Sequence, residues 1–214
     1  MTITGKQLNQ ITPALNGAYA ESIAKFLNAV LPVYKMDTVD IMEEFIPNLL
    51  VECCEFTRFE EGLNYSAPRL MQVWRKRFPT LAIANQYAHQ PQKLANYVYG
   101  GRMGNNTVND GWAFRGSGVI QATGKDIVSD FTKYYNKMFG TTYTPYLMAE
   151  MMRDKVNIIM GLHFACWFFS IAKGLINYAI NDNFKAVVLR INGGYNGMED
   201  RTRYYNRAKI ALRT

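Results

Sequence analysis

The chain reads Tyr-Val-Tyr-Gly-Gly-Arg-Met-Gly-Asn from Tyr97 to Asn105 and Asp-Gly-Trp-Ala-Phe-Arg-Gly-Ser-Gly-Val-Ile-Gln-Ala-Thr-Gly from Asp110 to Gly124. Glycine lets a backbone approach a bulky ligand and adopt conformations that are closed to other residues. Aromatic faces, amides and hydroxyls match the mixed apolar and polar surface of a sugar ring. We therefore interpret these two stretches as part of a carbohydrate-binding cleft.

Two glutamates, Glu52 and Glu61, precede these stretches. Enzymes break glycosidic bonds with two carboxyl groups, one protonating the leaving oxygen and the other acting on the opposite face of the sugar. Helical spacing of Leu49, Leu50 and Phe56 places Glu52 beside an apolar face, and burial favours the protonated form of a carboxyl that must donate a proton. Periodicity alone fits a solvated surface glutamate equally well. The pair and the glycine-rich stretches together predict carbohydrate cleavage.

Composition limits the classes of protein that the chain can belong to. Its 214 residues, 49% hydrophobic and 19% charged, predict one ordinary globular core. We expect residues 1–214 to form a single catalytic domain, with about residues 1–17 as a flexible N-terminal segment. The net charge of +7 indicates an anionic partner. No basic cluster interleaved with aromatics is present, so an anionic cell envelope is at least as good a candidate as nucleic acid.

The few cysteines and histidines argue against disulfide, metal or thiol chemistry. Cys53, Cys54 and Cys166 cannot form a fully paired framework, which fits synthesis in a reducing cytoplasm. His89 and His163 have no spacing that makes a metal site with the cysteines, so we expect no metal and no other cofactor. His163 and Cys166 lie three apart in an apolar segment and are interpreted as core residues.

Periodicity and capping residues predict a mainly α-helical chain. Helices are expected over residues 18–30, 37–56 with a kink at Pro47, 69–78, 94–97, 125–139, 145–173, 184–191 and 199–212. Residues 60–65 are expected to form a loop or short hairpin that carries Glu61. The only regular structure expected in the glycine-rich region is short strands or a small hairpin. The longest apolar run, residues 158–172, is shorter than the roughly twenty residues that cross a bilayer.

Several motifs follow one another in a recognisable order. Glu52 is followed by Glu61-Gly-Leu-Asn-Tyr-Ser, then by the two glycine-rich stretches, and then by Arg190-Ile-Asn-Gly-Gly. From about residue 35 to the C terminus this order closely resembles the family 19 glycoside hydrolases, a chitinase-like group that includes many bacteriophage endolysins. The resemblance implies a lysozyme-like fold of two helical lobes, with a small β-hairpin or irregular segment at the cleft between them.

The resemblance also assigns roles to individual residues. It implies that Glu52 is the catalytic acid, that Glu61 is the base that activates water, and that Thr123 helps to hold this water while the anomeric carbon is inverted. Substrate contacts are expected for Asn64, Tyr65, Arg102, Asn105, Gln121, Asn192 and Arg201. No cofactor is implied.

Three positions depart from the family pattern. Residues 51–56 read Val-Glu-Cys-Cys-Glu-Phe where the family has His-Glu-Ser-Gly-Gly-Phe, Ser117 replaces an arginine, and Asp126-Ile127 replace Asn-Tyr.

The two glutamates, the glycine-rich stretches and the resemblance together predict an endolysin that cleaves the β-1,4 bonds of peptidoglycan and lyses its host. A chitinase of the same family and a non-catalytic glycan-binding module are the alternatives.

The expected partners and location follow from this interpretation. Peptidoglycan glycan strands are the predicted partner. The protein is expected to be a monomer and to bind no nucleic acid. In the C-terminal helix, Arg203, Arg207, Lys209 and Arg213 point largely away from the apolar side. This helix is either an ordinary docked helix with a solvated face or a surface for anionic outer-membrane or wall polymers. No secretory signal pattern begins the chain, so we expect it to stay in the host cytoplasm until release to the periplasm or cell wall.

Overall fold

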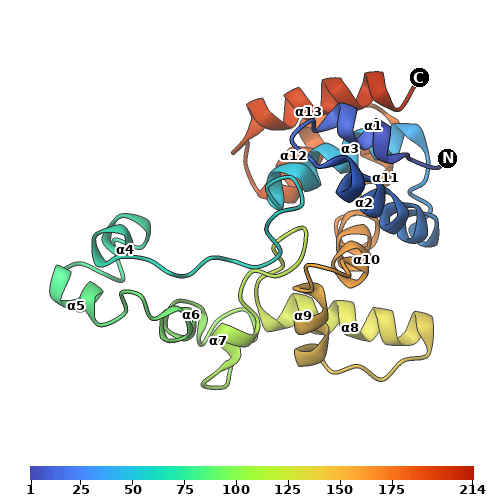
Figure 1. The fold of residues 1–214 in the computed structure, drawn as a ribbon. Coiled ribbons are helices and arrows are strands. Elements are labelled where there is room, and N and C mark those ends of the chain that lie inside the picture. Colours follow the sequence, from blue (N-terminus) through green and yellow to red (C-terminus); the bar gives the residue numbers. More distant parts are fainter. The chain divides into compact units, whose positions relative to one another are not determined.

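A computed structural model describes residues 1–214. The chain is mainly α-helical, as predicted (Figure 1). Its helices are α1 (Gly5–Ile11), α2 (Gly17–Val30), η1 (Leu31–Tyr34), α3 (Val39–Glu52), α4 (Ala67–Val73), α5 (Leu81–Asn85), α6 (Pro91–Tyr99), α7 (Asp110–Ala113), α8 (Lys125–Phe139), α9 (Pro145–Met152), α10 (Ile159–Trp167), η2 (Phe168–Ala172), α11 (Ile176–Ile180), α12 (Phe184–Asn192) and α13 (Met198–Ala211). The lysozyme-like fold class is confirmed. In place of the expected hairpin, the chain forms only isolated bridges that join Ser117 to Glu60 and to Ala122.

The chain divides into two compact units, which are described separately. The first comprises Met1–Phe59, Gly118–Ile120 and Asp154–Thr214, and the second comprises Glu60–Ser117 and Gln121–Arg153. The two glutamates that the sequence singles out therefore fall in different units, Glu52 in the first and Glu61 in the second.

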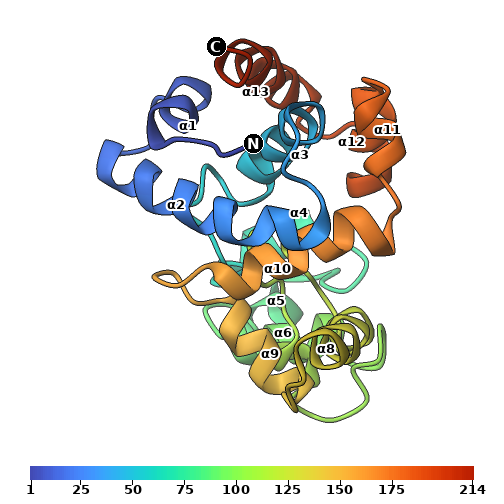
Figure 2. The same cartoon turned by 90° about the vertical axis from the view of Figure 1, so that its right-hand side faces the viewer.

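Helix α3 is the centre of the first unit. It packs against α13, α11 and α12, and its residues from Ile41 to Leu50 are all buried. Pro47 lies inside the helix, yet α3 continues to Glu52 as one element because it is enclosed by its neighbours. Helix α2 packs against α1, η1 and α10, and Figure 2 shows α2 running beside α10. The first unit thus buries the helix that ends at Glu52.

The N-terminal segment contains a helix that periodicity did not predict. Thr4 and Gln7 form a capping box at the start of α1. Ile3, Leu8 and Ile11 are buried, and α1 packs on α2 and α13. The structure therefore places a docked helix in the segment expected to be flexible.

The second unit has its own apolar cluster, formed mainly by residues of α4, α5 and α6. Its buried members are Leu63, Ala67, Leu70, Phe78, Ala84, Leu94, Ala95 and Val98. Helices α8 and α9 pack on each other in the same unit. The single helix expected over residues 145–173 is wrong, because α9 ends at Met152 and Asp154 Oδ1 accepts hydrogen bonds from the amides of Val156 and Asn157 at 2.8 and 2.9 Å. Such a turn competes with the helical hydrogen-bond pattern.

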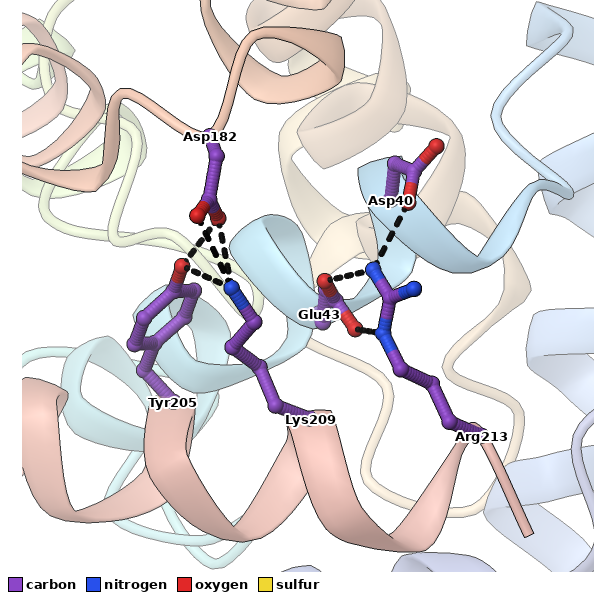
Figure 3. Close-up of polar contacts among 6 residues, drawn as sticks. All are labelled: Asp40, Glu43, Asp182, Tyr205, Lys209 and Arg213. Carbon is purple, nitrogen blue, oxygen red and sulfur yellow. Dashed lines mark hydrogen bonds and ion pairs between the residues drawn. The ribbon is translucent and has the colours of Figure 1, made fainter.

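Helix α13 is the last helix of the first unit, and ion pairs hold its C-terminal half in place (Figure 3). Lys209 Nζ lies 2.9 Å from both carboxylate oxygens of Asp182, which also accepts a hydrogen bond from Tyr205. Arg213 binds Glu43 at 2.6 and 3.0 Å and Asp40 at 2.8 Å. Arg203 pairs with Asp200 at 2.7 Å, so three of the four cations expected on the solvated face of this helix are neutralised within the protein.

None of the helices is long and apolar enough to cross a membrane. The three cysteines are all free, with Cys53 and Cys166 buried and Cys54 half-buried. Burial raises the pKa of the Cys53 thiol to about 12 and raises that of Cys166 as well. His163 is also buried, which lowers its pKa to about 4, and its Nδ1 lies 3.2 Å from the Tyr34 hydroxyl. These groups belong to the core, as the sequence predicts for His163 and Cys166.

Candidate active site

Glu52 is the last residue of α3, and its side chain is paired with a buried arginine. Arg201 Nη2 lies 2.5 Å from Glu52 Oε1, and the exposed fractions of the two side chains are 2% and 20%. Arg201 Nη1 donates to Asn48 Oδ1 at 2.7 Å, one helical turn before Glu52. Helix α13 thus holds a guanidinium against the end of α3. Glu52 Oε2 makes no hydrogen bond within the protein.

The loop between α12 and α13 supports this arginine. Asn192 Nδ2 donates to the carbonyl oxygens of Asn196 and Gly194 at 3.3 and 3.4 Å. Arg201 Nε donates to the same Asn196 carbonyl at 3.3 Å. The structure therefore brings Asn192 and Arg201 together, and it gives Asn192 a place in shaping the loop that orients Arg201.

A left-handed turn follows Glu52. Cys54, Glu55 and Phe56 have φ values of 49°, 57° and 59°. L-residues in this conformation cost roughly 1–2 kcal/mol each, because Cβ comes too close to the following carbonyl oxygen. Phe56 is buried, its amide donates to Cys53 Sγ at 3.3 Å, and its carbonyl accepts from the Tyr19 hydroxyl at 2.9 Å. The turn is therefore held by surrounding contacts.

Glu55 is the most strongly anchored side chain of this turn. Its Oε1 accepts hydrogen bonds from Thr12 Oγ1 and from the Tyr204 hydroxyl, both at 2.6 Å. These two hydrogen bonds lower the pKa of Glu55. Arg203 and Arg207 lower it further by their charge. The family pattern has glycine at this position, and here a carboxylate ties the turn to α13 and to the residue after α1.

Glu61 occupies the irregular segment predicted for it in the second unit. Its Oε1 accepts a hydrogen bond from the Tyr99 hydroxyl at 2.6 Å, and its Oε2 accepts one from the Gly116 amide at 3.3 Å. Burial, and then the hydrogen bond to Glu61, raise the pKa of Tyr99, so this phenol remains a donor at neutral pH. A side chain at Gly116 would come within 3.0 Å of Glu61 Cβ and of Gln121 Oε1. Only glycine leaves this space for the carboxylate.

Ser117 lies at the centre of the glycine-rich segment that carries these groups. Its backbone exchanges two hydrogen bonds with Ala122, at 3.0 and 2.8 Å. Its hydroxyl donates to the Arg115 carbonyl at 2.7 Å and accepts from Arg153 Nη1 at 2.9 Å. Burial, followed by the charge of Arg115, lowers the pKa of Arg153 to about 10. The guanidinium of Arg153, which comes from the end of α9, thus reaches the position where the family pattern has an arginine.

Gln121 and Thr123 follow in the same segment. Gln121 has a φ of 53°, and its carbonyl accepts a hydrogen bond from Thr123 Oγ1 at 3.0 Å. Both residues are half-buried. The structure therefore places Gln121 and Thr123 with Gly116 and Glu61 in the second unit.

The other predicted contact residues also lie in the second unit. Asn64 is exposed and pairs with His89 Nδ1 at 2.8 Å, and the ring of Tyr65 packs edge-on against Trp74. Arg102 is exposed. Asn105 is 1% exposed, and its amide accepts from the Lys125 backbone at 3.1 Å and donates to the Tyr99 carbonyl at 3.0 Å. Asn105 thus braces the C-terminal end of α6, which carries Tyr99.

The sequence interpretation missed three residues of this site. Tyr99 lies in the glycine-rich stretch Tyr97–Asn105, but only the fold reveals its hydrogen bond to Glu61. Glu55 and Arg153 act through partners that are distant in the chain. A signal for Glu55 does exist, because a charged residue stands where the family pattern has glycine.

Comparison with known proteins gives an independent result. No family model matches the chain. A curated protein of Haemophilus influenzae, named "Glycosyl hydrolase family 19 domain-containing protein", is 32% identical over 210 residues. The match covers 96% of this chain and 94% of that protein, so it extends over both units.

Proposed function

Because the chain belongs to glycosyl hydrolase family 19 and is a glycoside hydrolase, we propose that it is an endolysin that cleaves the β-1,4 bonds of bacterial peptidoglycan with inversion. Residues 1–214 act as one catalytic domain, with Glu52 as general acid and Glu61 as general base. The pairing of Glu52 with Arg201 is the observation that carries the proposal. Release from the cytoplasm to the wall then lyses the host cell.

The surroundings of Glu52 fix one oxygen of its carboxyl group and leave the other one unengaged. Arg201 engages Oε1 and fixes the direction of the carboxyl group, while Oε2 makes no hydrogen bond within the protein. This second oxygen can carry the proton to the glycosidic oxygen as the bond breaks. Transfer of a proton by a positioned carboxyl group typically contributes a factor of about 10²–10⁴ to the rate.

The surroundings of Glu61 suit a base that activates water. Tyr99 and the Gly116 amide donate to the two carboxylate oxygens and hold the group in one orientation. Each oxygen keeps a further lone pair that can accept a proton from water. Thr123 donates its own proton to Gln121, so its hydroxyl oxygen is oriented to accept a hydrogen bond from that water. An inverting hydrolase needs this division between an acid and a water-activating base.

The choice of peptidoglycan over chitin rests on charge. The two polymers share the β-1,4 linkage, so the carboxylates do not distinguish them. Peptidoglycan carries acidic lactyl and peptide groups, and a protein with a net charge of +7 is attracted to an acidic polymer.

We expect the purified protein to clear permeabilised Gram-negative cells and to release muropeptides with cut glycan chains, while releasing little from crystalline chitin. Mass spectrometry of the products identifies the bond that is cut. A Glu52→Gln variant, prepared in parallel, controls for contaminating hydrolases. Efficient chitin hydrolysis without muropeptides would make the protein a chitinase, and binding to the wall without products from either polymer would make it a glycan-binding module.

Wall binding and lysis should weaken as salt rises, because attraction between exposed charges is screened over about 8 Å at physiological ionic strength. Arg75 and Lys76 are exposed, and the double variant Arg75→Glu/Lys76→Glu lowers the net charge without touching the candidate site. Sedimentation with purified walls should show weaker binding of this variant, while its cleavage of a short soluble oligosaccharide remains unchanged. The charge-conserving pair Arg75→Lys/Lys76→Arg is the control. Salt-independent binding would contradict the electrostatic attraction.

A further inference from the structure

The left-handed turn after Glu52 has an anchor whose role goes beyond the proposed chemistry. We propose that Glu55 is a positioning residue for Glu52: it locks the turn Cys54–Phe56 and, through Tyr204, holds the helix that presents Arg201 to Glu52. This inference rests on the proposed function, because it assigns Glu55 a part in placing the general acid.

The conformation of the turn requires an anchor. Three consecutive residues other than glycine have positive φ, and two of them stand where the family pattern has glycine. Such residues remain in this conformation only when the surrounding structure over-determines it, and they concentrate at functional sites. The turn also determines where the chain leaves α3, because Thr57 and Arg58 donate their amides to the Cys53 carbonyl at 3.1 and 2.9 Å.

Glu55 supplies the anchor from two directions. One carboxylate oxygen accepts from Thr12, which is fully buried after α1, and from Tyr204 on α13, whose exposed fraction is 6%. Hydrogen bonds to a charged acceptor are stronger than those between neutral groups. The Glu55 carboxylate therefore joins three segments of the first unit at the point where α3 ends.

The link to Glu52 runs along one face of α13. Arg201 and Tyr204 are three residues apart and therefore share a face of the helix. Arg201 binds Glu52, and Tyr204 binds Glu55. Helix α13 is thus fastened to the end of α3 at two adjacent points. Loss of the Tyr204–Glu55 contact allows the Arg201–Glu52 contact to shift. A small displacement of a catalytic group lowers the reaction rate strongly.

The test compares two neighbouring tyrosines of α13. Tyr204→Phe removes the hydroxyl that donates to Glu55, whereas Tyr205→Phe removes one that donates to Asp182 (Figure 3) and not to the turn. We expect Tyr204→Phe to lower kcat on peptidoglycan about tenfold, with KM within about twofold of wild type because the removed hydroxyl donates to Glu55, which is not among the expected substrate contacts. Tyr205→Phe should keep the wild-type kcat. Equal kcat values for both variants and wild type overturn the inference.

A second pair of variants tests the strain itself. Glu55→Ala and Glu55→Gly both remove the carboxylate, but only glycine adopts a φ of 57° without strain. Thermal unfolding checks that both variants are folded at the assay temperature. The kcat of the glycine variant should then be several-fold higher than that of the alanine variant. Equal values would show that locking a strained turn is not what Glu55 does.

Amide hydrogen exchange separates this inference from the proposed function. Tyr204→Phe should speed exchange at Thr57 and Arg58, and Tyr205→Phe should not. If the wild-type protein cleaves no glycan, the proposed function fails, and exchange still decides whether Glu55 locks the turn. If the wild type is active and exchange changes while kcat does not, Glu55 is merely structural and the positioning role is overturned.

Discussion

Replacing Glu52 with glutamine is expected to reduce peptidoglycan cleavage by a factor of about 10²–10⁴ while the fold is retained. Glutamine has nearly the same shape and still offers Arg201 an oxygen acceptor, but it carries no transferable proton. Turbidity loss of permeabilised cells measures the rate, and far-ultraviolet circular dichroism checks the fold. The effect should appear in kcat, because the proton is transferred only as the bond breaks.

A matched control for this variant lies on the same helix. Glu43 is buried on α3 and pairs with Arg213 at 2.6 Å, as Glu52 pairs with Arg201. Glu43→Gln therefore removes an equivalent carboxylate–guanidinium pair without touching the proposed acid, and it should retain activity. Near wild-type lysis by Glu52→Gln, or an equal loss in both variants, would show that Glu52 is not the acid.

Replacing Glu44 with methionine is expected to stabilise the protein above neutral pH by roughly 2–4 kcal/mol. Glu44 on α3 is fully buried, and neither carboxylate oxygen has a hydrogen-bond partner. Burial, followed by the charges of Asp182 and Glu43, raises the pKa of Glu44 from 4.5 to about 8, and Lys209 opposes this only in part. Methionine fills a similar volume without a group that ionises.

The sign of the pH dependence follows from the direction of this shift. The unfolded chain loses the Glu44 proton near pH 4.5, whereas the folded chain keeps it until about pH 8. The stability present below pH 4.5 is therefore lost as pH rises towards 8, by about 1.4 kcal/mol per unit. The lowered pKa of His163 reduces the free energy of unfolding of the protein only below about pH 6.5. The window from pH 6.5 to 8 therefore isolates Glu44.

Urea unfolding at pH 6.5, 7.25 and 8 measures this dependence. Wild-type stability should fall across the series, and Glu44→Met should remove most of the slope. Glu150 is exposed on α9, and Glu150→Met should leave the slope unchanged. A wild-type stability that stays flat over this range would mean that Glu44 is ionised or paired in solution.

Sequence patterns predicted helices such as α2, α8 and α12 well, because strong periodicity and local caps decide where they begin and end. Helix α8 matches the expected range of residues 125–139, and Gly140 ends it in the left-handed conformation. Asn183 caps α12 at its expected start. Short helices such as α5 and α11 have too few residues for a periodic signal, and they form because their neighbours pack on them.

The buried face of α13 shows why local patterns fail for part of the site. The sequence pattern puts Met198, Tyr205, Ala208 and Leu212 on one apolar side of this helix. Ala208 and Leu212 are indeed buried, but the buried face also carries Arg201 and Tyr204. A buried arginine is invisible to a pattern that searches for apolar residues, and its partner Glu52 lies 149 residues away. The resemblance placed Arg201 among the cleft residues. Only the fold supplied its partner.

The burial of two of the three thiols limits the oxidation chemistry open to this protein. The thiolate is the reactive form of cysteine, and burial keeps Cys53 and Cys166 protonated at neutral pH. Both thiols are therefore shielded from oxidants in the surrounding solution, and only half-buried Cys54 is open to them. Exposure to an oxidising medium thus leaves two of the three cysteines chemically unchanged.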